Sequence, residues 1–364
     1  MKKMHALAVA LSLAPFAGAA NADLLVAIAG PMTGQYASAG DQIRKGAEMA
    51  IADINAKGGV LGQKLVLEVG DDACDPKQAV SVANTMVNKK IVFMHGHWCS
   101  SSTIPASDVY AEAGIPMATV STNPKVTERG LKNVFRIMGR DDQQGEVAGN
   151  FIAEKFKANK VAVVDDKSAY GKGLADEIAK AMTAKDFKPV LRESITAGEK
   201  DYSSLVTKLK SAGVDVMAFG GYHTEVALIL RQAQQAGLKL TILGGDTMTN
   251  SELITAAGAA ADNVYFTFAP DPRKNADAAD VVKKFRDAKV EPEGYVMYAY
   301  AAMQLFAEAA GQAKSGKPAD VQKALAAGNF STVIGKLAFD AKGDNKAPGF
   351  VTYRWQGGKY DYAK

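Results

Sequence analysis

The 364-residue chain has only two cysteines, no run of five basic residues and, beyond its N-terminus, no long hydrophobic stretch. A net charge of +4 without a basic cluster gives no reason to expect a nucleic-acid partner. A transmembrane helix, which needs about 20 apolar residues, is not expected after the N-terminus either. Low-complexity tracts are missing too.

Catalytic motifs are also missing. The chain has no GxSxG, no HExxH and no GxGxxG after a strand, and "GNFSTVIGK" has six residues rather than four between its glycines. Among four histidines, His223 in "GGYHTE" is the one candidate for a catalytic base, and a polar residue at a helix start is the favoured interpretation. We therefore expect no enzymatic activity, no cofactor and no metal.

The first 22 residues have the form of a secretory signal peptide. Lys2 and Lys3 precede a short apolar segment, and Ala20-Asn21-Ala22 is a small-x-small cleavage site. We expect cleavage after Ala22, and no lipid anchor because no cysteine lies at the cleavage point to be acylated. The remaining 342 residues are enough for two domains.

Cys74 and Cys99 are expected to form a disulfide, because an exported chain reaches an oxidising compartment. The bond would close a loop of about 25 residues and contribute roughly 3–4 kcal/mol to stability. A metal site with His95 and His97 is the alternative. In "HGH", however, the two histidines alternate as in a strand, and no CxxC accompanies them, so the disulfide is favoured.

Strand-like apolar segments alternate with helical segments along the chain. Strands are expected at 24–29, 65–69, 91–94 and 116–120, and then at 160–164, 189–193, 214–219, 238–243 and 263–268. Helices 276–287 and 294–314 follow, with strands at 336–339 and 349–355. Two such series predict an α/β protein with two lobes, each a largely parallel sheet covered by helices on both faces.

In open α/β sheets, ligands bind beyond the carboxyl ends of the strands, where helices begin. The corresponding loops carry hydroxyl groups, aromatic rings and glycines in both halves of the chain: 30–40, 97–103, 120–124, 165–173, 220–225 and 244–250. Two facing sets of polar loops predict one small molecule in a cleft between the lobes.

The loop "HWCSSST" leads into a helix expected from about Ser102. Helix N-termini carry unpaired N–H groups and a partial positive charge, and Ser100, Ser101 and Ser102 would add neutral donors that suit a carboxylate. An N-capping serine with solvated neighbours is an equally good interpretation. Asp246, in a glycine-flanked loop, is either a turn residue or the partner of an ammonium group. Carboxylate and ammonium partners together describe an α-amino acid.

Six stretches carry a more specific signal: "DINAKGGVLGQKL", "DDACDPKQAV", "GHWCSSSTIPASD", "ITAGEKDYSSLV", "GGYHTE" and "LRQAQQAGLK". They resemble the periplasmic leucine/isoleucine/valine-binding proteins that serve ABC importers, along essentially the whole chain. The resemblance implies the type I periplasmic binding fold: two Rossmann-like lobes joined by a three-strand hinge, with the ligand cleft between them. Lobe 1 would be 23–141 plus 270–347, and lobe 2 would be 142–269 plus 348–364. A monomeric periplasmic protein that delivers its ligand to an inner-membrane ABC permease/ATPase complex is implied.

The resemblance also assigns roles to polar residues. Ser100 and Thr122 would bind the ligand carboxylate, and Ser121 would face the ammonium. Asp246 would pair with the ammonium, although the family commonly has the longer glutamate there. Cys74–Cys99 would correspond to the family's disulfide beside the site.

The side-chain pocket departs further from the family pattern. Tyr170 and Tyr222 would close on the ligand from the second lobe. Trp98 stands where leucine is usual, Ala39 where an aromatic residue is usual, and Tyr295 adds a hydroxyl to the apolar end. We expect a neutral α-amino acid, foremost leucine, isoleucine or valine. An aromatic amino acid, another carboxylate and a role as a ligand sensor are the alternatives.

Overall fold

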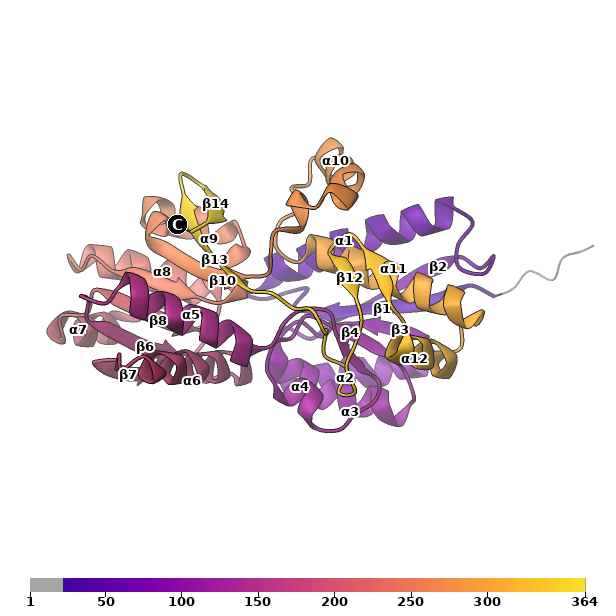
Figure 1. Cartoon of the computed structure of the whole chain (residues 1–364), viewed down its shortest axis with the longest axis horizontal. Helices are drawn as coiled ribbons and strands as arrows, with labels where there is room; N and C mark the ends of the chain where they lie inside the picture. The colour runs from indigo at the N-terminus through magenta and orange to yellow at the C-terminus, as the bar shows by residue number, and fades with distance from the viewer. Residues whose placement is uncertain (1–21, 364) are drawn as a thin grey trace, which may run out of the picture.

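The computed structural model describes residues 22–363 and shows two α/β lobes side by side (Figure 1). The expected fold class, with two lobes of mostly parallel sheet, is confirmed. The expected signal peptide, apart from Ala22, lies outside the described residues. No helix within 22–363 is long and apolar enough to cross a membrane.

The elements follow one another in the expected alternation. The strands are β1 Leu24–Gly30, β2 Leu65–Asp71, β3 Phe93–His95, β4 Met117–Thr119, β5 Val134–Arg136, β6 Val161–Asp165, β7 Leu191–Ser194, β8 Val216–Gly220, β9 Thr241–Gly244, β10 Val264–Phe268, β11 Phe330–Thr332, β12 Gly335–Leu337, β13 Val351–Gln356 and β14 Lys359–Tyr362. The α-helices are α1 Ala37–Ala56, α2 Pro76–Asn88, α3 Ser100–Glu112, α4 Lys125–Glu128, α5 Asp141–Lys155, α6 Ala169–Ala184, α7 Ser203–Ser211, α8 His223–Gln235, α9 Glu252–Ala257, α10 Ala279–Asp287, α11 Val296–Ala313 and α12 Pro318–Ala327. Short 3-10 helices include η1 Asp246–Thr249.

The first lobe is built on a five-stranded sheet in the order β2-β1-β3-β4-β5, with every pair parallel. Successive residues of β1 face opposite sides, as a strand requires. Val26 and Ile28 belong to the core that includes α1 and α11, whereas Ala27 and Ala29 belong to a second core under α2 and α3. A sheet that is covered on both faces explains why its strands read as continuous apolar runs.

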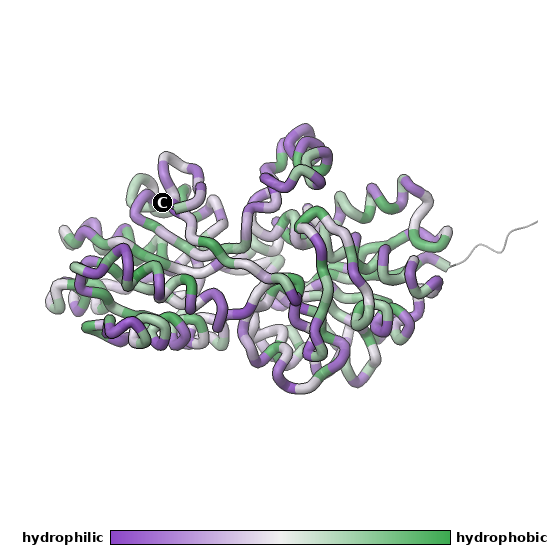
Figure 2. The backbone as a smooth tube through the Cα atoms, viewed as in Figure 1, coloured by the Kyte–Doolittle hydropathy of each residue, from purple (hydrophilic) through white to green (hydrophobic). Residues whose placement is uncertain are grey.

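The second lobe has a seven-stranded sheet in the order β14-β13-β10-β9-β8-β6-β7. Strands β6 to β10 pair in parallel, and the C-terminal hairpin β13–β14 is added in antiparallel orientation. Trp355 of β13 is buried and donates from Nε1 to the Met248 carbonyl at 2.8 Å. Hydrophobic segments run through the interior of both lobes, and hydrophilic ones lie mainly on outer helices and connections (Figure 2).

The chain passes between the two sheets three times: after β5, after β10 and after β12. Sequence patterns did not predict several short elements, including β5 and α12. Strand β5 has three residues and ends in Arg136, a charged side chain that interrupts the apolar pattern. Helix α12 carries a readable signal, Pro318 in its first turn, that was overlooked.

Local signals explain where some helices begin. The Asp75 side chain caps α2 by accepting hydrogen bonds from the N–H groups of Lys77 and Gln78 at 2.9 and 2.8 Å, and Pro76 fills the first turn. In contrast, no serine caps α3. It begins at Ser100, two residues earlier than expected, and its N-cap is Cys99.

We predict that Gly46→Ala destabilises the first lobe. Helices α1 and α11 approach so closely that a Cβ at Gly46 would collide with the Val296 carbonyl oxygen. Overpacking of this kind should lower the free energy of unfolding by about 1–3 kcal/mol in chemical denaturation. Gly311→Ala in α11 is the control, because a Cβ there meets nothing within 4 Å and should leave stability unchanged or raised. Equal stability of the two variants would contradict the packing argument.

Candidate functional site

A small cavity of about 10 Å³ lies where the carboxyl ends of the two sheets face each other. Ten residues line it: Trp98, Ser100, Val120, Ser121, Thr122, Tyr170, Tyr222, Asp246, Thr247 and Tyr295. Eight of the nine ligand-binding residues expected from the sequence are among them; Ala39 is buried in α1 and is not part of this lining. Val120 and Thr247 were not expected, although each directly adjoins an expected residue. The structure therefore brings the predicted loops of both lobes together.

The three serines at the start of α3 do three different things. Ser100 lines the cavity, and its Oγ accepts a weak hydrogen bond from the Asn123 N–H at 3.4 Å. Ser101 Oγ accepts from the Ala169 N–H of the other lobe at 3.2 Å. The Ser102 hydroxyl is buried and has no partner among the described residues. Of the three serines expected to suit one carboxylate, only Ser100 lines the cavity.

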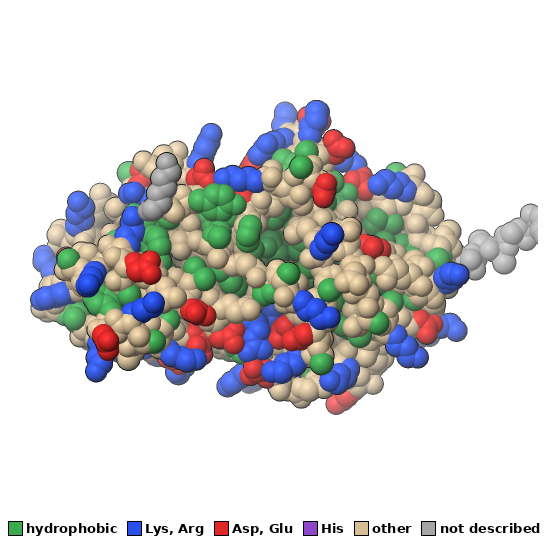
Figure 3. All heavy atoms as spheres, viewed as in Figure 1, with side chains coloured by type: hydrophobic (Ala, Val, Ile, Leu, Met, Phe, Trp, Pro, Cys, Tyr) green, Lys and Arg blue, Asp and Glu red, His purple; other side chains and the backbone are tan. Residues whose placement is uncertain are grey.

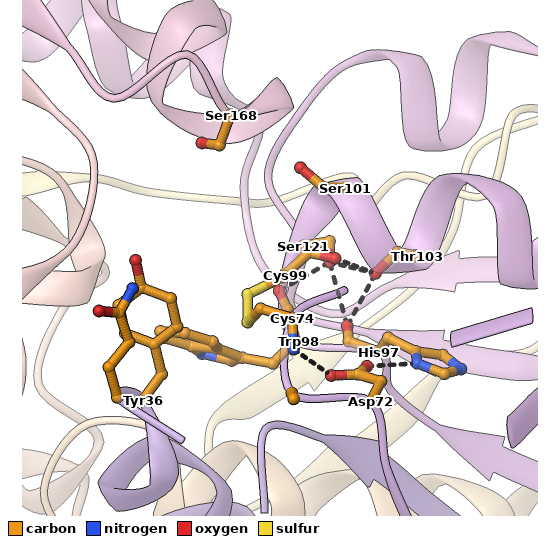
Figure 4. The surroundings of a disulfide bond; sticks show 12 residues. Tyr36, Asp72, Cys74, His97, Trp98, Cys99, Ser101, Thr103, Ser121 and Ser168 are labelled. Atoms are coloured by element: carbon orange, nitrogen blue, oxygen red, sulfur yellow. Dashed lines mark hydrogen bonds and ion pairs between the residues drawn. A yellow bond between two sulfur atoms is a disulfide. The ribbon is translucent and has the colours of Figure 1, made fainter. Parts of the chain in front are cut away.

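The loop after β4 is fixed by hydrogen bonds to the backbone segment that precedes α3. Ser121 Oγ donates to the carbonyls of His97 and Trp98, at 3.0 and 2.9 Å, and shares a short hydrogen bond with Thr103 Oγ1 (Figure 4). The Ser121 hydroxyl thus gives its proton to the protein and can meet a ligand only as a hydrogen-bond acceptor. Thr122 lines the cavity and its carbonyl accepts from the Asp141 N–H at 2.8 Å.

Cys74 and Cys99 form the expected disulfide, directly beside the start of α3 (Figure 4). The metal alternative does not fit the histidines: His97 Nδ1 pairs with buried Asp72 at 2.5 Å, and His95 Nδ1 contacts the Ala118 carbonyl at 3.1 Å. Within residues 22–363, no group of histidines, cysteines and carboxylates is arranged to hold a metal ion.

Asp246, at the start of η1, is a buried carboxylate surrounded by donors from both lobes. Its Oδ1 accepts from Tyr170 Oη at 2.9 Å and from Gln144 Nε2 at 3.1 Å, and its Oδ2 accepts from Tyr295 Oη at 2.5 Å. The Tyr295 hydroxyl, expected at the apolar end of the pocket, therefore lies at the acidic end. Burial raises the pKa of Asp246, and these hydrogen bonds lower it in part. A carboxylate has about four acceptor positions, so one remains for a ligand's ammonium.

Aromatic rings form the remaining wall. The Tyr222 ring lies 4.4 Å from Tyr36, 5.3 Å from Trp98 and 5.3 Å from Tyr170, measured between ring centroids. Trp98 meets Tyr295 edge-on at 5.4 Å. Because Tyr222 belongs to the second lobe and Tyr36 and Trp98 to the first, the contacts of Tyr222 with these two rings require the lobes to be closed.

Polar contacts close the rim of the cleft around α1 and α8. Glu225 Oε1, on the buried first turn of α8, accepts from Tyr36 Oη at 3.2 Å and from Gln35 Nε2 at 3.3 Å across the cleft. Ser38 Oγ of the first lobe donates to Glu252 of the second at 2.6 Å. Sequence reasoning missed Glu225, although its position in the predicted loop "GGYHTE" was a usable signal.

His223 does not complete a catalytic triad with its neighbours. Its Nε2 faces both Glu252, at 3.2 Å, and Ser38 Oγ, at 3.5 Å, while its Nδ1 has no partner among the described residues. A triad needs one ring nitrogen for the nucleophile and the other for the orienting acid. The arrangement instead fits a polar contact between lobes.

A second buried carboxylate, Asp141, lies next to Thr122 of the cavity wall. Sequence reasoning did not predict it as a site residue. Neither of its carboxyl oxygens has a hydrogen-bond partner of regular geometry among the described residues. Burial first, and then the negative charge of Asp246, raise the pKa of Asp141 well above its usual value; the nearby Thr122 hydroxyl and Arg136 lower it only in part.

This environment predicts that Asp141→Asn stabilises the folded protein and that the rise in Tm depends on pH. The folded protein keeps the Asp141 proton at pH values where the unfolded chain, with a pKa of about 3.9, has lost it, so wild-type stability falls as pH rises through that window. The variant lacks this loss and should have a Tm above that of the wild type at pH 7 and closer to it at pH 4. Asp142→Asn, at a half-buried neighbour paired with Arg140, should bring no such rise in Tm. A Tm difference independent of pH would contradict the assignment.

Two named proteins are similar to this chain over nearly its full length. Leu/Ile/Val-binding protein homolog 1 of Brucella melitensis is 50% identical over 352 residues, which cover 95% of both chains. The leucine-, isoleucine-, valine-, threonine- and alanine-binding protein of Pseudomonas aeruginosa is 43% identical over 362 residues, covering 97% of this chain and 96% of the relative.

Solved structures of similar proteins share the fold over nearly the full length. The leucine-binding protein LivK of Thermotoga maritima matches with a TM-score of 0.86 at 26% identity and covers 94% of this chain and 98% of its own. LivJ of Streptococcus pneumoniae, in complex with isoleucine, matches with a TM-score of 0.84 at 28% identity and covers 93% and 98%. The periplasmic binding protein family model matches residues 24–359. With this match across both lobes, and a cavity formed by both, the chain belongs to the periplasmic binding protein family.

Proposed function

We propose that the protein is the substrate-binding component of an ABC importer and captures a neutral α-amino acid, with leucine, isoleucine and valine as its foremost ligands. One observation carries the proposal: Ser100, at the N-terminus of α3, and the buried carboxylate of Asp246 line the same cavity from opposite lobes. A helix N-terminus with a hydroxyl suits a carboxylate, and a carboxylate with a spare acceptor position suits an ammonium. The names of the relatives point in the same direction.

In the proposed complex, the ligand carboxylate would lie against Ser100 and the Thr122 loop, and its ammonium against Asp246. The side chain would contact Trp98 and Tyr222. Two hydrogen bonds within the second lobe, from Gln144 and Tyr170, hold the Asp246 carboxylate in place before a ligand arrives, which reduces the entropy lost on binding, and closure adds the third, from Tyr295. Tyr295 thus helps to hold Asp246, which is shorter than the family's usual glutamate, in position to pair with the ammonium.

Capture would proceed by closure of the two lobes. The ligand would first bind the first lobe, and Tyr170, Tyr222 and Asp246 would then enclose it. A ligand can favour the closed form only through contacts that the open form lacks, and these are the contacts made by the second lobe. Glu225 and Glu252 add bonds at the rim that do not involve the ligand.

We further propose the lobe boundaries 23–141 plus 270–347 and 142–269 plus 348–364, with 1–22 as a signal peptide removed after Ala22. Export would place the protein in the periplasm, where a permease and ATPase complex would receive the ligand. The three passages of the chain between the sheets agree with these boundaries. We assign no catalytic step to the site.

The function is tested by thermal-shift and calorimetric titration of unfolded and refolded protein with the twenty amino acids and their deaminated analogues. Branched-chain amino acids should raise the Tm, as ligands that bind only the folded state do. Ser100→Ala should weaken binding by roughly 10- to 100-fold, because a hydrogen bond to a charged group is lost in a closed site. Ser102→Ala, which removes a hydroxyl without a partner in the described part of the chain, is the matched control and should bind as the wild type does.

Stabilisation only by ligands that lack an α-ammonium would contradict the proposal.

We also predict that Glu225→Ala shortens the lifetime of the complex. Loss of the bonds from Tyr36 and Gln35, which exist only between closed lobes, should raise the ligand dissociation rate by roughly tenfold and change the association rate little. Stopped-flow fluorescence of Trp98, which lines the cavity, would follow both rates. Glu146→Ala, exposed on α5, is the control. An unchanged dissociation rate would exclude a contribution of Glu225 to closure.

A further inference from the structure

Arg136, at the end of β5, places a fully buried guanidinium directly behind the ligand loop. Its Nη1 donates to the carbonyls of Ser121, in a short bond, and Asn123, at 3.1 Å. Its Nη2 donates to Thr127 Oγ1 at 2.7 Å, and its Nε donates to Asp344 Oδ1 at 2.8 Å. One side chain thus connects both ends of the loop 121–123 to a carboxylate more than 200 residues away in sequence.

Asp344 lies in the third segment that connects the two sheets, the one after β12. It also accepts a hydrogen bond from the first connecting segment, the one after β5. Arg140, the N-cap of α5, donates from Nη1 to Asp344 Oδ2 at 3.0 Å. Thr127 Oγ1 also donates to Asp344, at 2.9 Å. Where the lobes meet on the face shown in Figure 3, acidic and basic side chains alternate at the lower edge. The two connecting segments are therefore tied to each other through the carboxylate that holds Arg136.

The loop 121–123 is in turn the place where hinge, ligand site and second lobe come together. The Thr122 carbonyl accepts from the Asp141 N–H at the start of α5, and the Asn123 N–H donates to Ser100 Oγ. Asn123 Nδ2 donates to the Ala169 carbonyl of the second lobe at 2.6 Å. A displacement of either connecting segment is thus transmitted to the cavity wall through bonds to this loop.

We propose that Arg136 is a positioning residue that couples the connecting segments to the ligand loop, so that the loop reaches its binding geometry when the segments take their closed arrangement. The inference rests on the proposed amino-acid site and adds to it a residue that touches no ligand. A lysine at this position has a single nitrogen and cannot reach two carbonyls, a hydroxyl and a carboxylate at once. Buried ion pairs are a weak source of stability compared with apolar packing, which favours a positional role.

The test compares Arg136→Lys and Asp344→Asn with Met86→Ala. Met86 packs against β2, at the opposite edge of the first sheet from β5, so its variant lowers the Tm without touching the loop. Two quantities are measured: the Kd for L-leucine by calorimetry, and the hydrogen exchange of amides 119–127 in the ligand-free protein. Thr127→Val, which removes a hydroxyl bonded to both Arg136 and Asp344, serves if Arg136→Lys does not fold.

We expect Arg136→Lys and Asp344→Asn to raise the Kd by about tenfold or more and to speed exchange in 119–127, because the loop loses its anchor. Met86→Ala should change neither quantity, even at an equal loss of Tm. A Kd within about twofold of wild type in both variants, with unchanged exchange, would overturn the inference. If wild-type protein binds no amino acid, the proposed function fails, and the exchange measurement alone decides the role of Arg136.

Discussion

Burying a carboxylate without compensation is costly, and closure of the two lobes both buries Asp246 and adds a hydrogen bond that offsets part of that cost. Gln144 and Tyr170 reach it from the second lobe, and Tyr295 reaches it from the first. Opening the cleft would remove the Tyr295 bond and admit water, so the state of this one acid is linked to the separation of the lobes. The aromatic contacts around Tyr222 and the polar rim at Glu225 depend on the same closed arrangement.

Much of the fold could be predicted from the sequence because its signals are local. Apolar strands and helix starts such as Asp75-Pro76 are readable within a few residues, and parallel α/β sheets place their loops at a common edge. This reasoning brought Ser100 and Asp246 to one cavity without knowledge of the structure. The short strand β5 and helix α12 were missed, the former because three residues ending in arginine form no pattern.

Bonds between distant residues could not be predicted in this way. Tyr36 and Glu225 are 189 positions apart, and Arg136 and Asp344 are 208 apart, and no local periodicity links either pair. The resemblance placed Tyr295 in the pocket, but the direction of its hydroxyl depends on where Asp246 lies in the other lobe. The serine run shows the same limit at short range, because the helix turns each successive side chain toward a different neighbour.

The disulfide has a consequence for when the site becomes complete. Cys99 is the residue immediately before α3, so its bond to Cys74 pins the turn that presents Ser100 to the loop following β2. Such a bond forms under oxidising conditions and is absent under reducing ones. A freshly made chain in a reducing compartment would lack this covalent brace at the base of its anion-binding turn. Maturation of the binding turn would then be tied to passage out of the compartment of synthesis.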